Sequence, residues 1–368
     1  MRIFYDHQIF SLQDAGGASR YFYELARHLG AINGPRLEIG LGLNSSIYPF
    51  RKIATANTRI FERRVTLSPG VPRYVVNEII SNIFGFTRGR FDIYHSTLYR
   101  TIPLLRRRRT VVTHHDCTHE LFPHLFRNAA MIIESKRRLY SAADAVICVS
   151  EASRRDLLRF YSVDEERTKV IYHGFAPFVR PINDQNQTCG GSLKYILFVG
   201  ARGGYKNFMA LLEAYATSGA AVDYELVAVG GGEFVAAELE KIKQLGIMKR
   251  IRLIPKATDE LLAATYKNAA LLVYPSLYEG FGFPPLEAMS LGCPVLTANT
   301  SSMPEVCGEA AFYFDPTDPA ALKFALQRAL SDTEGTQRMK DKGYQQVTRF
   351  RWERTADETL NVYRRVLE

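Results

Sequence analysis

The stretch from Ala270 to Met289 constrains the fold of this chain more than any other part of the sequence. Residues 270–274 form an apolar run, which predicts a buried parallel strand. A glycine-rich turn follows and leads to Pro284-Pro285, a pair typical of a helix start, because the first helical turn needs no amide donor there. Backbone amides and a helix dipole at such a turn favour an anion. The sequence therefore predicts a strand, an anion-binding turn and a helix in succession.

Two carboxylates flank this turn. Glu279 precedes it, and we expect Glu287 in the first turn of the following helix. Amide donors suit phosphate, whereas carboxylates accept hydrogen bonds from sugar hydroxyls, so a nucleotide-sugar would satisfy both kinds of group. The alternative is that the acidic residues only offset the helix dipole.

The string from Glu279 to Glu287 resembles the E-x7-E signature of the retaining family-4 glycosyltransferases. The resemblance implies an α/β protein of GT-B architecture, in which two Rossmann-like domains face each other across a cleft. It implies that Glu279, as a catalytic residue, hydrogen-bonds hydroxyls of the donor sugar, and that Glu287 hydrogen-bonds those of the ribose. The intervening amides would stabilise the leaving diphosphate, at Gly280, Phe281, Gly282 and Phe283.

The length of 368 residues exceeds what one hydrophobic core usually supports, so two domains are expected. Read with the resemblance, residues 1–175 form an N-terminal domain that binds the acceptor. Residues 176–192, rich in Pro, Asn, Gln and Gly, form a linker. Residues 193–350 form the donor-binding domain, and a helix over 351–368 crosses back towards the first domain.

Arg202 and Lys206 bracket two glycines between a predicted strand and a helix that begins at Phe208. Arginine grips phosphate as a fork and lysine as a point charge. The pair resembles the two cations with which the family neutralises the donor diphosphate. Two solvated loop cations are the alternative.

A second glycine turn, Gly16-Gly17, precedes a helix predicted over residues 19–29, with Ser19 as its N-cap. The turn lacks the G-x-G-x-x-G spacing of a dehydrogenase. In the resembled family this loop lets the backbone approach the phosphate and sugar of the donor. A plain tight turn is an equal alternative.

Histidines follow the strand predicted at residues 110–113. A histidine at the carboxyl end of a parallel strand points into the ligand crevice of an open sheet. This string resembles the strand-end histidine that lies near the transferred sugar in the family, with His115 the best match and His114 the second. No helical histidine pair with a helper carboxylate appears nearby, so a metal site is the weaker interpretation and no metal or cofactor is expected.

Charge is unevenly distributed along the chain. Residues 1–180 carry 27 Lys and Arg against 16 Asp and Glu, and the remainder carries 20 against 22. The basic half predicts an anionic partner, for which nucleic acid, an anionic membrane surface and a lipid pyrophosphate are candidates. Nucleic acid is disfavoured, because the strongest motifs lie in the half without excess positive charge.

Five scattered cysteines without a Cys-x-x-Cys pair favour a reducing compartment and no disulfide framework. The first residues predict a strand rather than a signal peptide. We therefore expect a cytoplasmic protein, or one peripheral to the inner face of the plasma membrane.

These observations and the family resemblance, which alone implies retention, predict a retaining, metal-independent hexosyltransferase of polysaccharide or lipopolysaccharide biosynthesis. It would move a sugar from a GDP- or UDP-linked donor, such as GDP-mannose, to a glycan acceptor that is lipid-linked. One alternative is a related GT-B sugar phosphorylase or nucleotide-sugar epimerase. The other is a basic membrane- or nucleic-acid-binding protein with an inactive cleft.

Overall fold

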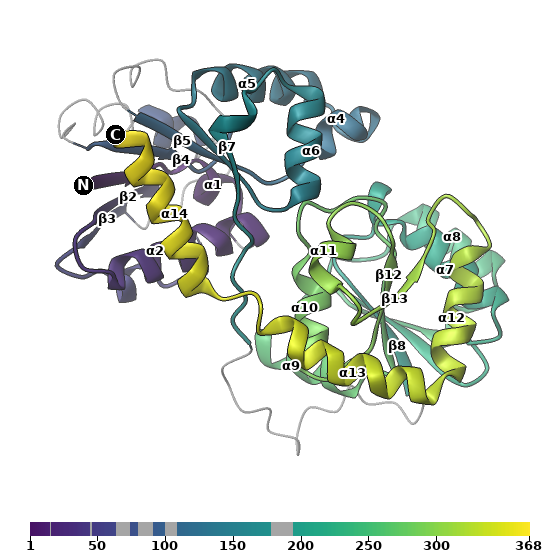
Figure 1. Cartoon of the computed structure of the whole chain (residues 1–368). Coiled ribbons are helices and arrows are strands. Elements are labelled where there is room, and N and C mark those ends of the chain that lie inside the picture. Colours follow the sequence, from purple (N-terminus) through teal and green to yellow (C-terminus); the bar gives the residue numbers. More distant parts are fainter. Residues whose placement is uncertain (15, 45, 64–73, 80–90, 100–108, 178–193) are drawn as a thin grey trace. The chain divides into compact units, whose positions relative to one another are not determined.

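The computed structural model describes residues 1–14, 16–44, 46–63, 74–79, 91–99, 109–177 and 194–368. The chain divides into two units, shown in Figure 1. Unit 1 is Met1–Gly174 together with Arg351–Glu368, and unit 2 is Phe175–Phe350. Residues 178–192 of the predicted linker lie outside the described residues.

In its described part, unit 1 is built on a seven-stranded sheet of order β3-β2-β1-β4-β5-β6-β7, in which every neighbouring pair is parallel. The strands are β1 (Arg2–Tyr5), β2 (Arg36–Leu43), β3 (Thr58–Arg63), β4 (Ile93–Ser96), β5 (Arg109–His114), β6 (Ala145–Cys148) and β7 (Thr168–Val170). The helices are α1 (Gln8–Leu12), α2 (Gly17–Ala31), α4 (Thr118–Leu121), α5 (Ala129–Ala142), α6 (Glu151–Phe160) and α14 (Trp352–Leu367), with 3-10 turns η1 (Phe50–Ile53), η3 (Pro123–Leu125) and η4 (Glu165–Arg167).

Unit 2 repeats the design with a parallel sheet of order β10-β9-β8-β11-β12-β13. Its strands are β8 (Lys194–Val199), β9 (Tyr224–Val229), β10 (Ile251–Ile254), β11 (Leu271–Tyr274), β12 (Val295–Ala298) and β13 (Phe312–Phe314). Its helices are α7 (Phe208–Thr217), α8 (Ala236–Gln244), α9 (Asp259–Asn268), α10 (Phe283–Ser290), α11 (Met303–Cys307), α12 (Ala321–Ser331) and α13 (Thr333–Val347), with 3-10 turns η5 (Gly204–Lys206) and η6 (Met248–Arg250).

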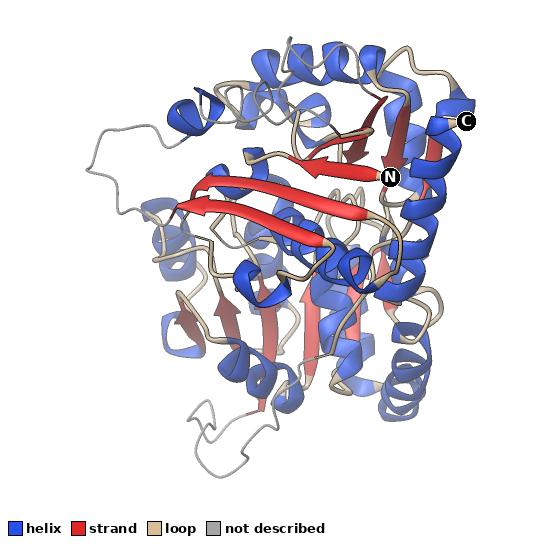
Figure 2. Ribbon diagram, turned by 90° about the vertical axis from the view of Figure 1, so that its left-hand side faces the viewer, coloured by secondary structure: helices blue, strands red, loops and turns tan. Residues whose placement is uncertain are grey.

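Helices lie on both faces of each sheet, as the strands and helices of Figures 1 and 2 show. Because both faces are covered, the central strands are mostly apolar, and every residue of β11 and β12 is buried. The predicted α/β class with two Rossmann-like domains is confirmed. No helix of the described residues has the length and apolar character needed to cross a bilayer.

The strand order reverses between β1 and β4 in unit 1, and between β8 and β11 in unit 2. In an open parallel sheet, ligands bind outside the carboxyl ends of the strands at such a reversal. The topology therefore selects the loops that follow these four strands.

Helix α14 belongs to unit 1, although all of unit 2 precedes it in the sequence. The Tyr363 hydroxyl lies 2.5 Å from Nδ1 of His95 on β4 and 2.9 Å from the hydroxyl of Tyr5 on β1. At the start of the helix, Trp352 packs so closely on Gly174 that an added Cβ would lie 2.5 Å from the Cα of Trp352. A glycine is therefore required at position 174.

Two local predictions were wrong. Helix α2 begins at Gly17 rather than after Ser19, whose hydroxyl donates to the Gly16 carbonyl instead of capping the helix. Glu287 is the fifth residue of α10, beyond its first turn. Strand β3 was not predicted from the sequence.

Candidate functional site

The carboxyl edge of the unit 2 sheet brings together two of the predicted site residues. Lys206 lies in the loop after β8 and Glu279 in the loop after β11, the two strands at which the order reverses. The Lys206 ammonium lies 2.5 Å from Oε1 of Glu279, and the Tyr274 hydroxyl donates to the same oxygen at 2.7 Å. The two charged side chains are 16% and 12% exposed. The pair is therefore largely shielded but remains accessible.

The local backbone explains why Lys206 reaches this position. Gly204 and Asn207 bracket the 3-10 turn with left-handed φ angles of 55° and 58°, which turn the chain sharply into α7. The Leu277 amide donates to the Tyr205 carbonyl at 2.8 Å. This bond joins the two loops next to the ion pair.

The electrostatics keep Lys206 charged. Burial alone would lower the pKa of its ammonium, but the neighbouring Tyr274, Glu279 and Tyr205 outweigh burial and raise it above its usual range. The Tyr274 hydroxyl has a raised pKa because of its own burial and of the Glu279 carboxylate beside it. The site therefore holds an ammonium, a carboxylate and a neutral phenol at neutral pH.

The turn before α10 is held by the segment after β12. The Ser302 hydroxyl is within 2.9 Å of the carbonyl oxygens of Glu279 and Phe281, and the Glu279 amide donates to the Ser301 hydroxyl at 3.0 Å. Gly282 has a φ of 99°, and a Cβ there would lie 2.4 Å from Cε of Met303. Only a glycine fits this position, so the turn presents its backbone at the helix N-terminus.

Glu287 lies deeper in α10. Its side chain is buried, and it accepts a hydrogen bond from the Tyr266 hydroxyl at 2.9 Å. Burial, followed by the Glu287 carboxylate, raises the pKa of that tyrosine well above its usual range. The tyrosine fixes one carboxylate oxygen of Glu287.

Arg202 has different surroundings from Lys206, although both follow β8. The guanidinium is 5% exposed, and its Nε donates to Oε1 of Glu238 at 3.0 Å. Its remaining groups donate to the carbonyls of Gly230 and Glu233, the latter at 2.7 Å. Arg202 thus holds the glycine turn that follows β9, whereas Lys206 holds Glu279.

In unit 1, His115 directly follows β5. Its amide donates to the Tyr99 hydroxyl at 3.0 Å, and its ring lies 5.6 Å from the ring of Tyr21 and 5.9 Å from that of His173. Its Nε2 atom is buried and has no hydrogen-bond partner among the described residues. Burial lowers the pKa of His115 to about 4, with Asp116 opposing the shift and Lys136 adding to it. A neutral imidazole with one unused ring nitrogen therefore stands at the strand end.

With this geometry in view, comparison with known proteins identifies the family. Residues 15–177 match the family described as Glycosyltransferase Family 4, and residues 179–346 match Glycosyl transferases group 1. The chain is 30% identical over 272 residues to O-antigen chain mannosyltransferase B of Escherichia coli, covering 70% of this chain and 71% of that protein. The chain belongs to the family-4 glycosyltransferases.

Solved structures show that the glycosyltransferase shares its fold with distant relatives. Sucrose-phosphate synthase from Thermosynechococcus elongatus superposes with a TM-score of 0.77 at 20% identity, over 99% of this chain and 98% of that one. HepE of Anabaena, in complex with UDP and glucose, gives a TM-score of 0.71 at 19% identity, over 98% and 99% of the two chains. At these identities the likeness concerns the fold alone.

The structure distinguishes the two adjacent histidines of this glycosyltransferase. The His114 ring is fully buried, with Nδ1 2.6 Å from the Tyr140 hydroxyl and Nε2 3.5 Å from Sγ of Cys117. Both of its nitrogens are therefore engaged, whereas His115 keeps Nε2 unused. The described residues contain no group of three His, Cys, Asp or Glu side chains placed to hold a metal.

The Gly16-Gly17 turn is tightly closed. The Gly16 carbonyl accepts from the Arg20 amide at 2.9 Å and from the Tyr48 hydroxyl at 3.2 Å. A Cβ at Gly16 would lie 2.5 Å from Oε1 of Gln13. A side chain at this position would therefore have to displace Gln13.

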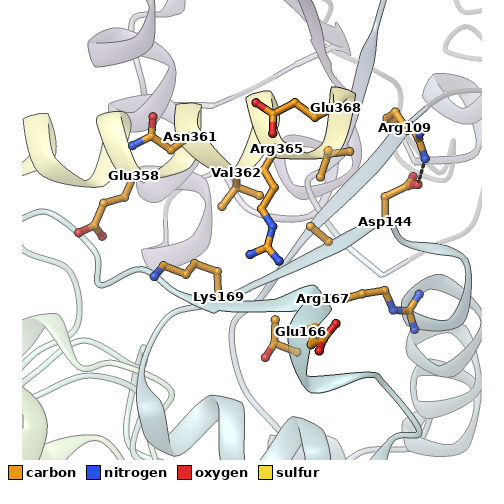
Figure 3. A pocket seen from close by; sticks show the side chains of 13 residues that line it. Arg109, Asp144, Glu166, Arg167, Lys169, Glu358, Asn361, Val362, Arg365 and Glu368 are labelled. Carbon is orange, nitrogen blue, oxygen red and sulfur yellow. Dashed lines mark hydrogen bonds and ion pairs between the residues drawn. The ribbon is translucent and has the colours of Figure 1, made fainter.

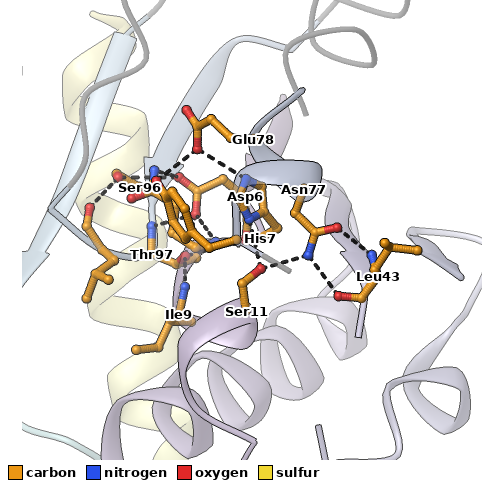
Figure 4. Close-up of polar contacts among 12 residues, drawn as sticks. Asp6, His7, Ile9, Ser11, Leu43, Asn77, Glu78, Ser96 and Thr97 are labelled. Carbon is orange, nitrogen blue, oxygen red and sulfur yellow. Dashed lines mark hydrogen bonds and ion pairs between the residues drawn. The ribbon is translucent and has the colours of Figure 1, made fainter. Parts of the chain in front are cut away.

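Sequence reasoning missed a polar network at the strand reversal of unit 1, drawn in Figure 4. Asp6, directly after β1, is fully buried and accepts from the Gln8 amide at 3.1 Å and the Thr97 amide at 3.2 Å. The hydroxyls of Tyr94 and Thr97 also donate to it. Asp6 thereby fixes the loops after β1 and β4 together, and its position after the first strand was the available signal.

The same network anchors the helical segment 74–79. Asn77 donates to the Ser11 hydroxyl and to the Leu43 carbonyl, both at 2.8 Å, and accepts from the Leu43 amide (Figure 4). Nδ1 of His7 lies 2.9 Å from the Ser11 hydroxyl. These bonds brace the edge of unit 1 on which His115 also lies.

A pocket of about 550 Å³ lies at the opposite, amino-terminal edge of the same sheet, in Figure 3. The starts of β5, β6 and β7 and one face of α14 line it. Basic and acidic side chains alternate around it, and Arg109 is paired with Asp144 at 2.8 Å. The pocket carries mixed charge and lies at the amino-terminal ends of the strands, whereas ligands of such sheets bind at the carboxyl ends. We therefore do not assign it to the candidate site.

Proposed function

We propose that this glycosyltransferase moves a hexose from a nucleotide-sugar to a glycan acceptor, with retention of the anomeric configuration and without a divalent metal. The observation that carries the proposal is the pair of Lys206 and Glu279 at the strand reversal of unit 2. A cation and a carboxylate side by side suit a ligand that offers both phosphate and sugar hydroxyls. The structural relative bound to UDP and glucose supports this choice of donor.

The chemical requirement is to stabilise the negative charge that develops on the diphosphate as it leaves the anomeric carbon. Lys206 supplies an ammonium, and the turn from Gly280 to Phe283 supplies a helix N-terminus. Arg202, whose own charge is paired with Glu238, holds the neighbouring glycine turn. These groups take the place of a metal ion.

Two carboxylates of unit 2, together with a histidine and the glycine turn of unit 1, would recognise the donor. Glu279 would accept hydrogen bonds from the donor sugar, and Glu287 from the ribose. In unit 1, we assign Nε2 of His115 to a hydroxyl of the transferred sugar, because it is the unused polar atom at that strand end. The Gly16-Gly17 backbone would approach the phosphate and sugar of the donor.

In the proposed reaction, the bond between the anomeric carbon and the diphosphate oxygen breaks while the acceptor oxygen attacks the same face. The proton of the acceptor hydroxyl passes to the leaving phosphate, so no protein nucleophile is needed. This route gives retention, which the family resemblance implies. A double displacement would instead need a carboxylate on the far face of the sugar.

The name of a relative supports the choice of donor, and the positive charge of the first half of the chain supports the choice of acceptor. The Escherichia coli relative is named an O-antigen chain mannosyltransferase, which favours a mannosyl donor such as GDP-mannose over other GDP- or UDP-linked sugars. The basic first half of the chain favours a lipid-linked glycan at an anionic membrane surface in polysaccharide biosynthesis.

One experiment tests the proposal. The enzyme is incubated with a panel of nucleotide-sugars and a lipid-linked glycan, with excess chelator, and the product is assigned by proton NMR. We expect transfer that persists in chelator and gives a retained anomeric centre. Activity that is lost in chelator and restored by magnesium, or an inverted product, would refute the proposal. Conversion of the nucleotide-sugar in the absence of the glycan would indicate an epimerase. Cleavage of the glycan that requires inorganic phosphate would indicate a phosphorylase.

A further inference from the structure

A fully buried ion pair lies beneath the loop that carries His115. Lys136 of α5 is 0% exposed and Glu120 of α4 is 3% exposed. The Lys136 ammonium donates to the two carboxylate oxygens of Glu120 at 3.0 and 3.1 Å, and to the Asp116 carbonyl at 2.9 Å. Three donors meet three acceptors, so the ammonium has no donor left for a ligand.

Stability alone does not account for such a pair. Removing two charges from water is costly, and an apolar pair of similar volume is often as stable or more stable. In some proteins a retained buried ion pair serves to select one conformation. Here, the conformation selected is that of the loop between β5 and α5.

Lys136 contacts the backbone next to His115 directly at Asp116, and it also contacts Tyr99, which bonds the His115 amide. The Asp116 carbonyl, one residue later, accepts from the ammonium directly. On the other side, the His115 amide donates to the Tyr99 hydroxyl, and the ammonium lies 4.7 Å from the centre of the Tyr99 ring. The Asp116 carboxylate closes the loop by accepting from the Thr118 amide at 2.9 Å.

We infer that Lys136 is a positioning residue, which fixes the peptide of His115 and thereby the direction of its imidazole. This inference rests on the proposed role of His115 in sugar binding. The contacts of the two residues differ. Lys136 donates all three of its hydrogen bonds to protein groups, whereas Nε2 of His115 is buried and has no partner among the described residues. The charge of Lys136 also adds to burial in keeping His115 neutral.

The test replaces both partners of the ion pair together, as Lys136→Met with Glu120→Leu, so that neither of the two is left without the other. We expect a melting temperature close to that of the wild type, shifted NMR signals of the His115 ring, and transfer slowed roughly tenfold to a hundredfold, because small misplacements of a contacting group are costly. The control is Arg137→Met with Glu134→Leu, an exposed ion pair of 2.5 Å on the same helix. It should change neither the ring signals nor the rate.

A double-mutant cycle with His115→Ala separates the possible outcomes. If Lys136 acts through His115, adding the apolar pair to His115→Ala slows transfer no further. Additive losses, or unchanged ring signals in a folded variant, would overturn the inference. Full activity of His115→Ala would overturn the proposed role of His115, while shifted ring signals would still support the positioning by Lys136. If the apolar pair does not fold, Lys136→Arg gives the same readouts.

Discussion

The assignment of Lys206 to the donor diphosphate makes a quantitative prediction for Lys206→Ala. In the structure, this ammonium bonds Oε1 of Glu279, and its side chain is 16% exposed. A diphosphate oxygen in the same place would receive a charge-assisted hydrogen bond, worth about 1.5–3 kcal/mol. Its loss should therefore weaken nucleoside diphosphate binding by about 10- to 150-fold.

The substitution also has a structural cost. It leaves the Glu279 carboxylate, 12% exposed, with the Tyr274 hydroxyl but without its cation. An unsatisfied, partly buried polar group costs about 1–3 kcal/mol, so a modest fall in the melting temperature of the protein should accompany the weaker binding. Turnover should fall as well, since the charge on the leaving group grows in the transition state.

Isothermal titration calorimetry with the nucleoside diphosphate measures the effect. Lys342→Ala is the matched control, because it removes the lysine of another ion pair in unit 2, 2.8 Å from Glu309 and well exposed. It should leave the dissociation constant unchanged. A Lys206→Ala protein that is folded and binds the diphosphate as tightly as this control would refute the assignment.

Three further predictions follow. Glu279→Gln should lower the melting temperature modestly, because Lys206 loses its carboxylate partner, and should slow transfer, since an amide accepts a sugar hydroxyl less strongly than a carboxylate; equal turnover would contradict this role. Because burial lowers the pKa of His115 to about 4 and of His95 to about 3, the unfolded state binds more protons below pH 6.5. The free energy of unfolding should fall by up to ~1.4 kcal/mol per pH unit for each histidine as the pH drops from 6.5 towards 4, and urea titrations that show no such loss would contradict it. The protein should bind anionic vesicles at low salt and release them as salt rises, and absent binding at low salt would indicate an acceptor away from the membrane.

The fold was predictable where strands are buried on both faces. Strands β8, β9, β11 and β12 are mostly apolar runs, and helix α7 begins at Phe208 as predicted. Strand β2 alternates buried and partly buried residues and contains Gly40 and Gly42, which weaken the pattern. Strand β3 contains charged residues, so the two strands at that edge of the sheet were missed.

The sequence indicated which residues to consider for the candidate site, but it did not indicate how they pair. The loops after β8 and β11 were recognised, yet only the strand order shows that Lys206 meets Glu279. Glu238, the partner of Arg202, lies on α8 between β9 and β10. No sequence pattern near either residue indicates that the two would meet. Asp6 meets Thr97 only because β4 pairs with β1. Contacts of this kind depend on topology, which local periodicity does not contain.

The return of α14 to unit 1 has a consequence for synthesis on the ribosome. Multidomain chains generally fold from the N-terminus as they emerge. Here, the Tyr5 and His95 side chains complete their contacts only with Tyr363, which is made after the whole of unit 2. Unit 2 is continuous from Phe175 to Phe350, and its two ends are joined by a hydrogen bond of 2.9 Å between the Phe175 amide and the Phe350 carbonyl.

The nascent chain therefore holds an incomplete unit 1 while unit 2 is translated and folds. During that interval the surface of α2 that α14 later covers is exposed, as is the buried face of the sheet around His95. A chaperone that binds apolar segments would find its substrate there, and stalled chains that lack α14 should be its preferred clients. Release from the chaperone would then be timed by the emergence of Trp352 and Tyr363.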